Sequence, residues 1–218
     1  MKSFKKQAGF TLVEIAIVLV IVGLLLAGVL KGQEMIENGR VKSAVTDMNG
    51  IAAAQASYLD RYKRIAGDDG DAVALAARGQ VWLAMAAGNV NGVLNGAALA
   101  NTFNPVGTEA EFFFRHLRAS GFLSGNPADV GVAAMPINAW GGRTAITNLV
   151  TQGRPVARLQ ICMGSVPGKA AAALDIQLDD GRPNAGDFRA TVGANNIAPG
   201  AAAAAYSEDQ TYTVCRNL

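Results

Sequence analysis

Four aspartates lie close together in the C-terminal third of the chain, where they could bind a metal ion. They are Asp175, Asp179, Asp180 and Asp187. Carboxylate oxygens are ligands that Ca²⁺ prefers, so Asp179, Asp180 and Asp187 are candidate calcium ligands. Their spacing lacks the D-x-D-x-D-G order and distal glutamate of an EF-hand loop. The alternative is a helix end followed by an Asp-Gly turn, in which Asp180 accepts hydrogen bonds from backbone amides.

Acid–base catalysis would depend on a single side chain, because His116 is the only histidine. A catalytic histidine also needs a positioned nucleophile and a group that orients the ring. A packed or surface histidine is the simpler interpretation. The sequence has no histidine-rich metal motif, no P-loop and no G-x-S-x-G elbow. We therefore expect no enzymatic activity, and no cofactor apart from the calcium considered above.

Another charged group stands out because its neighbours are apolar. Glu14 is the only charged residue between Phe10 and Leu30. A helix of about 20 apolar residues crosses the hydrocarbon core of a bilayer. A carboxylate at the centre of such a helix costs about 2.5–3.5 kcal/mol, and less near the interface. We therefore expect Glu14 to have a compensating partner.

A short basic leader precedes this span and contains Lys2, Lys5 and Lys6. By the positive-inside rule, these lysines keep the N-terminus in the cytoplasm and direct the rest of the chain outward. The chain has 19 basic and 17 acidic side chains. If the leader were cleaved off after Gly9, its three lysines would be removed and 16 basic side chains would remain. The basic character therefore belongs to the leader, and the net charge does not argue for nucleic-acid binding.

Two common N-terminal segments fit this pattern less well. A secretory signal peptide has an apolar region of about 7–15 residues that precedes its cleavage site. Here the apolar run is longer, and it follows the candidate cleavage site at Gly9-Phe10. A plain uncleaved membrane anchor leaves Gly9-Phe10 and Glu14 unexplained.

The N-terminal stretch resembles that of type IV prepilins and pseudopilins. The matching features are the basic leader, Gly9, Phe10 and, four residues after Phe10, Glu14. The resemblance implies that a membrane peptidase cleaves after Gly9 and methylates the new amine of Phe10. It also implies that Glu14 pairs with the N-terminal ammonium of a neighbouring subunit during filament assembly. Cleavage would also place the Phe10 amine within a helical turn of Glu14 in the same chain.

One long helix is expected from Phe10 to about Ile65, roughly 80 Å at 1.5 Å per residue. Residues beyond 40 recur at spacings of three and four and form a largely apolar stripe that should pack on a globular domain. The members of this stripe are Val41, Val45, Met48, Ile51, Gln55, Leu59, Tyr62 and Ala66. The glycines of Val22–Gly32 mark a segment that could unwind in a filament. The predicted organisation is a leader at 1–9, an assembly helix at 10–30, its amphipathic continuation at 31–66 and a globular head at 67–218.

The head is predicted to be α+β, with small helices and an antiparallel sheet of three or four strands. Thr108–Glu111 forms a potential capping box, and Gly121 is placed to end the helix that follows. The predicted helices cover 72–87, 109–120 and 169–178. The first of them should pack inward with Val73, Leu75, Trp82 and Leu83. The predicted strands are 144–151 and 156–163, joined by a turn at 152–155, and then 188–192 and 211–216.

Cys162 and Cys215 both lie in the part of the chain that is expected outside the cytoplasm. An even number of cysteines in an oxidising compartment favours a disulfide over two free thiols. A bridge closing a loop of about 54 residues would contribute about 4 kcal/mol on the chain-entropy model. Pilin-like families often carry such a C-terminal bridge, in agreement with this prediction.

The resemblance implies a structural filament subunit, either a type IV pilin or a type II secretion pseudopilin. The expected partners are other subunits, the prepilin peptidase and an inner-membrane assembly platform. The precursor would cross the inner membrane once, with its head in the periplasm, before it joins an extracellular pilus or a periplasmic pseudopilus. An alternative of another class is a membrane-tethered periplasmic binding module.

DNA is a further candidate partner, because pili can take part in DNA uptake. The arginines that could form a binding patch are Arg143, Arg154, Arg158, Arg182 and Arg189. Dispersed, solvated charges are the default interpretation of such a set.

Overall fold

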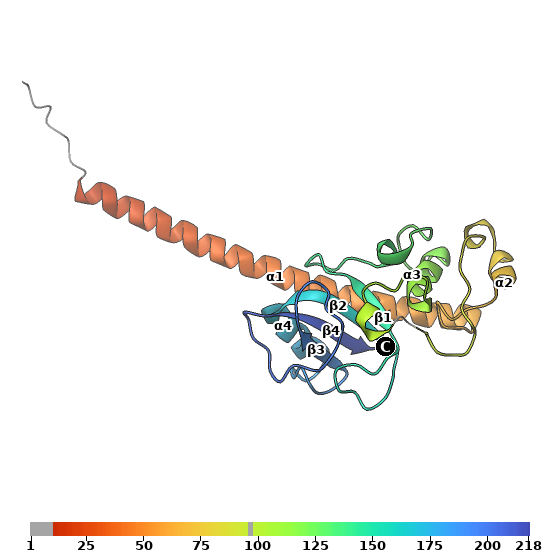
Figure 1. Cartoon of the computed structure of the whole chain (residues 1–218). Helices are drawn as coiled ribbons and strands as arrows, with labels where there is room; N and C mark the ends of the chain where they lie inside the picture. The colour runs from red at the N-terminus through yellow and green to blue at the C-terminus, as the bar shows by residue number, and fades with distance from the viewer. Residues whose placement is uncertain (1–10, 96–97) are drawn as a thin grey trace, which may run out of the picture. The chain divides into compact units, whose positions relative to one another are not determined.

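The computed structural model describes residues 11–95 and 98–218, and it divides into two compact units, of which the first ends at Gly39 and the second begins at Arg40. The fold is α+β, as predicted. The helices and strands are α1 (Leu12–Tyr62), α2 (Ala72–Ala76), α3 (Glu109–Ala119), β1 (Thr144–Thr147), β2 (Gln160–Pro167), α4 (Gly168–Leu178), β3 (Phe188–Val192) and β4 (Thr211–Asn217) (Figure 1).

The first unit contains the apolar part of α1. Every residue from Thr11 to Leu30 is exposed, and the helix is long and apolar enough to cross a bilayer. It is continuous through Val22–Gly32 in this single chain. Unwinding of that segment concerns a filament and stays a prediction.

The second unit begins with the amphipathic part of α1, whose apolar face is buried against the sheet and the other helices. Val41, Ala44, Met48, Ile51 and Tyr58 are at most 2% exposed and belong to the main core. Their spacings of three, four and seven residues place them on one helix face. The predicted stripe was wrong at Leu59, which is 46% exposed, because Tyr58 occupies the inward position at that turn.

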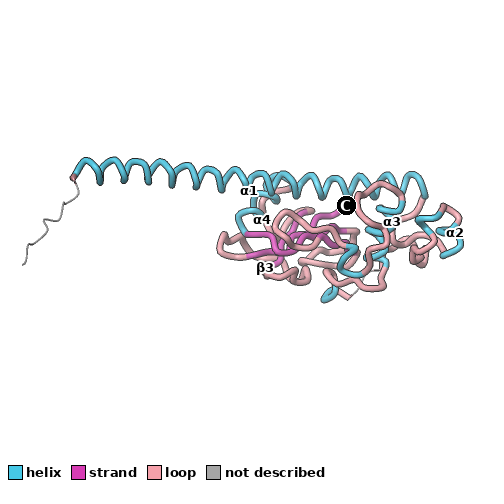
Figure 2. The backbone as a smooth tube through the Cα atoms, turned by 90° about the horizontal axis from the view of Figure 1, so that it is seen from above, coloured by secondary structure: helices cyan, strands magenta, loops and turns pink. Residues whose placement is uncertain are grey.

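The described residues form an antiparallel sheet of four strands in the order β1-β2-β4-β3. The sheet lies beside the part of α1 that follows Gly39 (Figure 1, Figure 2). Alternate residues such as Ile161, Met163 and Val214 join the main core with α1. Their neighbours Cys162 and Cys215 belong to a smaller apolar cluster. This alternation follows from the two-residue period of a strand.

The predicted antiparallel pairing of two strands around residues 152–155 is confirmed, with Thr147 opposite Gln160, but the pairing ends further from the turn than predicted. Strand β1 stops at Thr147 and β2 starts only at Gln160, so the intervening segment is a loop. Long-range hydrogen bonds hold this loop: the Gln152 amide donates to the carbonyl oxygen of Gly200, and Arg154 donates to that of Cys215. Bonds to distant segments replace the part of the ladder that was predicted between residues 148 and 159.

The helices before the sheet also depart from the prediction. The predicted helix at 72–87 shrinks to α2 and a 3₁₀ turn at Gln80–Trp82, because Gly79 adopts a φ of 125° between them. Leu75 and Trp82 are buried as predicted, whereas Val73 and Leu83, expected to pack inward, are exposed.

Helix α3 begins after Thr108 as predicted, but the capping box was wrong. The Thr108 hydroxyl donates to the carbonyl oxygen of Pro105, and the Glu111 carboxylate accepts from the amide of Gly107. The helix ends at Ala119, and Gly121, whose φ is 80°, follows at C′ as predicted. The amides of Gly121 and Phe122 donate to the carbonyl oxygens of Arg118 and Leu117, which is the bonding pattern of a Schellman motif.

His116 is fully buried on α3 and is a packed residue, as expected. Its Nδ1 accepts from the amide of Gly67 at 3.0 Å, and its Nε2 lies 2.8 Å from the carbonyl oxygen of Ala86. These partners require a neutral ring protonated at Nε2. The ring thereby ties α3 to the turn that follows α1. Burial is the main reason that the pKa of His116 falls from 6.5 to about 4, although the hydrogen bond to Ala86 opposes the shift.

We predict that His116 makes the folded state sensitive to acid. Between pH 6.5 and pH 4 the unfolded chain binds a proton that the folded chain excludes, so acid favours unfolding. The free energy of unfolding should fall by about 3 kcal/mol across this interval through His116. Asp69, Arg78 and Arg115 also act on the ring, so the test compares the wild type with His116→Gln. The variant should be less stable at pH 7 but should lose less stability on acidification, as measured by urea unfolding. Equal losses of unfolding free energy on acidification in both proteins would show that His116 is not the source of the acid sensitivity.

The predicted disulfide is present between Cys162 and Cys215. The two residues are directly opposite each other on β2 and β4, with their Cα atoms 4.1 Å apart. Both are fully buried. The bridge therefore fastens the two central strands of the sheet.

We expect the double variant Cys162→Ala/Cys215→Ala to lower the free energy of unfolding by about 2–5 kcal/mol. The physical reason is the larger conformational freedom of the unfolded chain without the cross-link. Denaturant titration of the full chain in detergent measures the effect, and reduced wild type serves as the matched control. If the free energy of unfolding changed by less than about 0.5 kcal/mol in both the double variant and the reduced wild type, the bridge would contribute little to stability.

Candidate functional site

The predicted processing residues Gly9 and Phe10 lie outside the described residues, so the site is built from Thr11 onward. Glu14 lies in the first turn of α1 and is exposed. None of residues 11–95 and 98–218 therefore shields its carboxylate from solvent, and the carboxylate would lie at the start of any membrane-spanning segment.

Glu14 and Thr11 form a reciprocal capping box. Glu14 Oε2 accepts hydrogen bonds from the Thr11 amide and from the Thr11 hydroxyl, each at 2.8 Å. The Thr11 hydroxyl oxygen in turn accepts from the Glu14 amide at 3.3 Å. The box satisfies amide groups that the first turn of a helix leaves free.

This box was not predicted, although Thr11-Leu12-Val13-Glu14 matches the T-x-x-E pattern that indicates one. Both side-chain bonds fall on Oε2, so Oε1 is without a partner among residues 11–95 and 98–218. Thr11 supplies neutral donors and does not cancel the negative charge. The geometry can therefore accept a cation at Oε1 while Oε2 holds the helix start.

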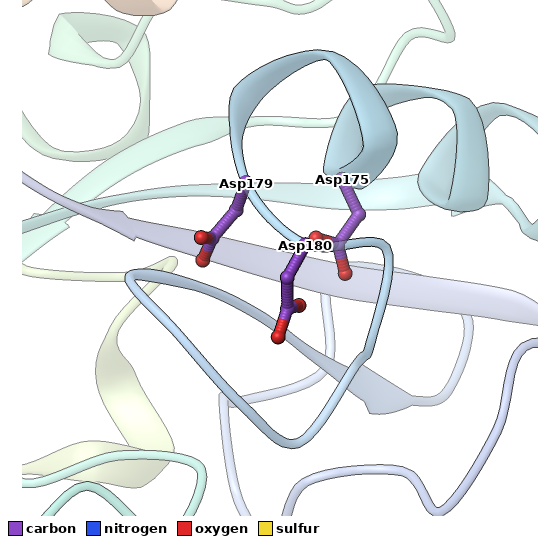
Figure 3. A group of neighbouring side chains, drawn as sticks. All are labelled: Asp175, Asp179 and Asp180. Atoms are coloured by element: carbon purple, nitrogen blue, oxygen red, sulfur yellow. The ribbon is translucent and has the colours of Figure 1, made fainter.

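The candidate metal ligands lie where α4 ends. Oxygen atoms of Asp175, Asp179 and Asp180 lie within 4.8 Å of one another (Figure 3). Asp187 is outside this group, and its Oδ1 accepts from Asn217 Nδ2 at 2.6 Å. The structure thus brings together two of the three predicted ligands, with the buried Asp175 in addition.

Backbone amides and a tyrosine already occupy much of this carboxylate group. Asp179 Oδ2 accepts from the amides of Asp187 and Phe188, at 2.5 and 2.9 Å. Asp180 Oδ1 accepts from the amide of Arg182 at 2.9 Å, as expected for an Asp-Gly turn. These bonds fix the turn that leads from α4 into β3.

The third member of the group, Asp175, is bonded on both oxygens. Its Oδ1 accepts from the amide of Gly181 at 3.0 Å and its Oδ2 from the Tyr206 hydroxyl at 2.6 Å. Burial raises the pKa of Asp175, and the nearby charges of Asp180 and Asp179 add to this while the two hydrogen bonds oppose it. A hard cation such as Ca²⁺ would suit the oxygen donors but would have to compete with these bonds.

We predict that Asp179 stabilises the head through its two backbone bonds and without calcium. Asp179→Ala should lower the free energy of unfolding by about 1–3 kcal/mol, because two amides lose their acceptor. Asp179→Asn keeps an acceptor oxygen and should lower the free energy of unfolding by less than Asp179→Ala does. Melting curves of the wild type in EDTA and in calcium should coincide. A saturable rise of the melting temperature with calcium, abolished in Asp179→Ala, would show a metal site instead.

Three of the five arginines that were considered for DNA binding line one cavity. Arg154, Arg158 and Arg189 line a common cavity of about 370 Å³. Arg143 donates to the carbonyl oxygen of Phe103, and Arg182 lies 3.9 Å from Asp180. Neither of these two lines the cavity.

The long apolar helix and the four-stranded antiparallel sheet give the chain a pilin-like α+β architecture. A family model described as the prokaryotic N-terminal methylation motif matches residues 4–30. No curated protein and no solved structure matches the chain. The chain therefore carries the N-terminal signature of type IV prepilins and pseudopilins.

Proposed function

We propose that the protein is a structural subunit, a pilin, of a type IV pilus or a related filament. In this proposal a prepilin peptidase cleaves after Gly9 and methylates the amine of Phe10, and subunits polymerise by packing their Phe10–Leu30 helices together. An inner-membrane platform carries out assembly. The observation that carries the proposal is an exposed apolar helix that starts with a capped carboxylate, within a matched methylation motif.

Burial of the helix explains why Glu14 needs an external cation. In a bilayer or a helical bundle, the residues between Leu12 and Leu30 lose their contact with water, and so does Glu14. The Thr11 bonds reduce the cost of removing Glu14 from water, but its charge still has to be balanced. Cleavage after Gly9 would create an ammonium at Phe10, and methylation leaves that amine protonated. The ammonium of a neighbouring subunit fits the free Oε1.

The leader supports the proposed route to the filament. Lys2, Lys5 and Lys6 would retain the N-terminus on the cytoplasmic side, so the head would enter the periplasm. The disulfide in the head is consistent with an oxidising compartment. The precursor is thus proposed to be a single-pass inner-membrane protein whose mature form ends in an extracellular pilus or a periplasmic pseudopilus.

A matched pair of variants separates the charge of Glu14 from its capping role. Glu14→Gln keeps an acceptor for the Thr11 amide but removes the charge, whereas Thr11→Ala removes the hydroxyl and keeps the charge. We expect Glu14→Gln to insert and to be processed, but to reduce filament recovery at least about tenfold, equivalent to about 1.4 kcal/mol. Thr11→Ala should have a smaller effect. Quantitative immunoblots of membranes and of sheared filaments measure both steps.

Normal filament recovery with Glu14→Gln would contradict the proposal and would favour a tethered binding module. The motif is common to pilins and type II secretion pseudopilins. Purified surface filaments that contain this chain as the main component would support a pilus. Loss of protein secretion without surface filaments would support a pseudopilus.

A further inference from the structure

The cavity of about 370 Å³ in the head is lined by charged side chains from three parts of the chain. The loop between β1 and β2 contributes Arg154 and Arg158, and β3 contributes Arg189. Asp179, from the end of α4, and Asp187, next to β3, bring negative charge. Three cations and two anions therefore share one cavity, with a net charge of +1.

The arginines of this cavity bind only neutral oxygens among the described residues. Arg189 donates to the carbonyl oxygens of Gly186 and Gln152, at 3.2 and 3.1 Å. The exposed Arg158 guanidinium has no hydrogen-bond or ion-pair partner in residues 11–95 and 98–218. The positive charges of these two side chains are therefore not matched by a contacting carboxylate.

Arg154 is the buried member of the set, with only 5% of its surface exposed. Its Nη2 donates to the carbonyl oxygens of Asp187 and Cys215, each at 2.9 Å, and its Nη1 donates to Gln152 Oε1 at 2.7 Å. Its Nε is buried without a partner among the described residues. Burial, followed by the charge of Arg189, lowers the pKa of Arg154 to about 10, so the group remains charged at neutral pH. A buried cation without a contacting anion is costly and calls for a compensating negative charge.

The two carboxylates of the cavity are engaged elsewhere. Asp179 is bonded to the amides of Asp187 and Phe188, and Asp187 is bonded to the side-chain amide of Asn217. They lower the net charge but form no direct ion pair with the arginines within 4 Å among the described residues. The arginine donors that remain unused are therefore available to an anion from outside.

We propose that this cavity binds a phosphate group, held by Arg158 and Arg189 in the positive field of the fixed Arg154. Guanidinium groups present paired N–H donors that match the oxygens of a phosphate. The phosphate could belong to free phosphate or to a nucleic-acid backbone, since the recognised chemistry is the same. The proposal does not depend on filament assembly, and it can be tested on the unassembled full chain.

The test titrates inorganic phosphate into the full chain in detergent, in a zwitterionic buffer, with sodium chloride holding the ionic strength constant. Amide NMR signals of Gly186, Asp187 and Arg189 report on the cavity. We expect saturable shifts of these signals in the wild type. The absence of saturable shifts up to roughly 10 mM phosphate, together with none on adding oligothymidylate, would overturn the proposal.

Variants that change the charge of the cavity test whether phosphate binding depends on its positive charge. Arg158→Gln removes a cation with no described partner in the fold and should weaken phosphate binding at least about threefold. Asp187→Asn keeps the acceptor for Asn217, removes an anion and should strengthen binding. Arg182→Gln is the matched control, since it removes the same charge from an exposed arginine outside the cavity, and it should leave binding unchanged. Equal weakening by Arg158→Gln and Arg182→Gln, or weaker binding in Asp187→Asn, would refute a specific site.

Short oligothymidylate distinguishes the two sources of phosphate. Competition between the oligonucleotide and phosphate for the same signals, with the same loss in Arg158→Gln, would assign the site to a nucleic-acid backbone. Saturable phosphate binding without competition would assign it to free phosphate or a small phosphorylated molecule. Either result supports the phosphate site.

Discussion

The apolar surface of α1 between Leu12 and Leu30 imposes the main constraint on this protein. All of these residues are exposed in the chain by itself. Burial of one large aliphatic side chain is worth about 1.5–3 kcal/mol, so this surface strongly favours a bilayer or a bundle of like helices over water. A basic leader, a capped carboxylate and a methylation motif lie at the same end of this helix, as expected if the proposed transfer from the membrane to a filament takes place.

The same helix serves a different purpose after Gly39, where the second compact unit begins. Here its inward face, with Met48 and Tyr58 fully buried, is part of an ordinary protein core. His116 ties α3 to the turn after α1, and the Cys162–Cys215 bridge fastens the centre of the sheet. The head therefore has its own sources of stability, and the apolar unit remains available for contacts with lipid or other subunits.

The secondary structure could be predicted from the sequence where the apolar pattern is regular or where a glycine ends an element. The strand β3 was predicted with its observed bounds, and Gly121 was correctly placed after α3, because local composition decides both. The two strands around residues 152–155 pair as predicted, but their ladder stops at Thr147 and Gln160, because Arg154 in the segment between them bonds to Asp187 and Cys215, residues far away in the chain. The helix predicted at 72–87 failed because the backbone conformation of Gly79 interrupts it.

The functional residues, like the fold, could be predicted where the local sequence pattern decides, but not where distant segments come together. Glu14 was identified from its charge in an apolar span, but its bond to Thr11 was overlooked although the local pattern indicates it. The grouping of Arg154, Arg158 and Arg189 depends on the tertiary fold, and no spacing in the sequence separates them from Arg143 and Arg182.

The proposed function depends on maturation of the chain between Gly9 and Phe10. Intact-mass and N-terminal peptide mass spectrometry of the protein from a host with a prepilin peptidase would detect this maturation. We expect a mature chain that starts at an N-methylated Phe10, and a full-length chain that starts at Met1 when the peptidase gene is deleted. A chain that keeps its leader, or that starts at an unmethylated Phe10, in the peptidase-containing host would contradict it.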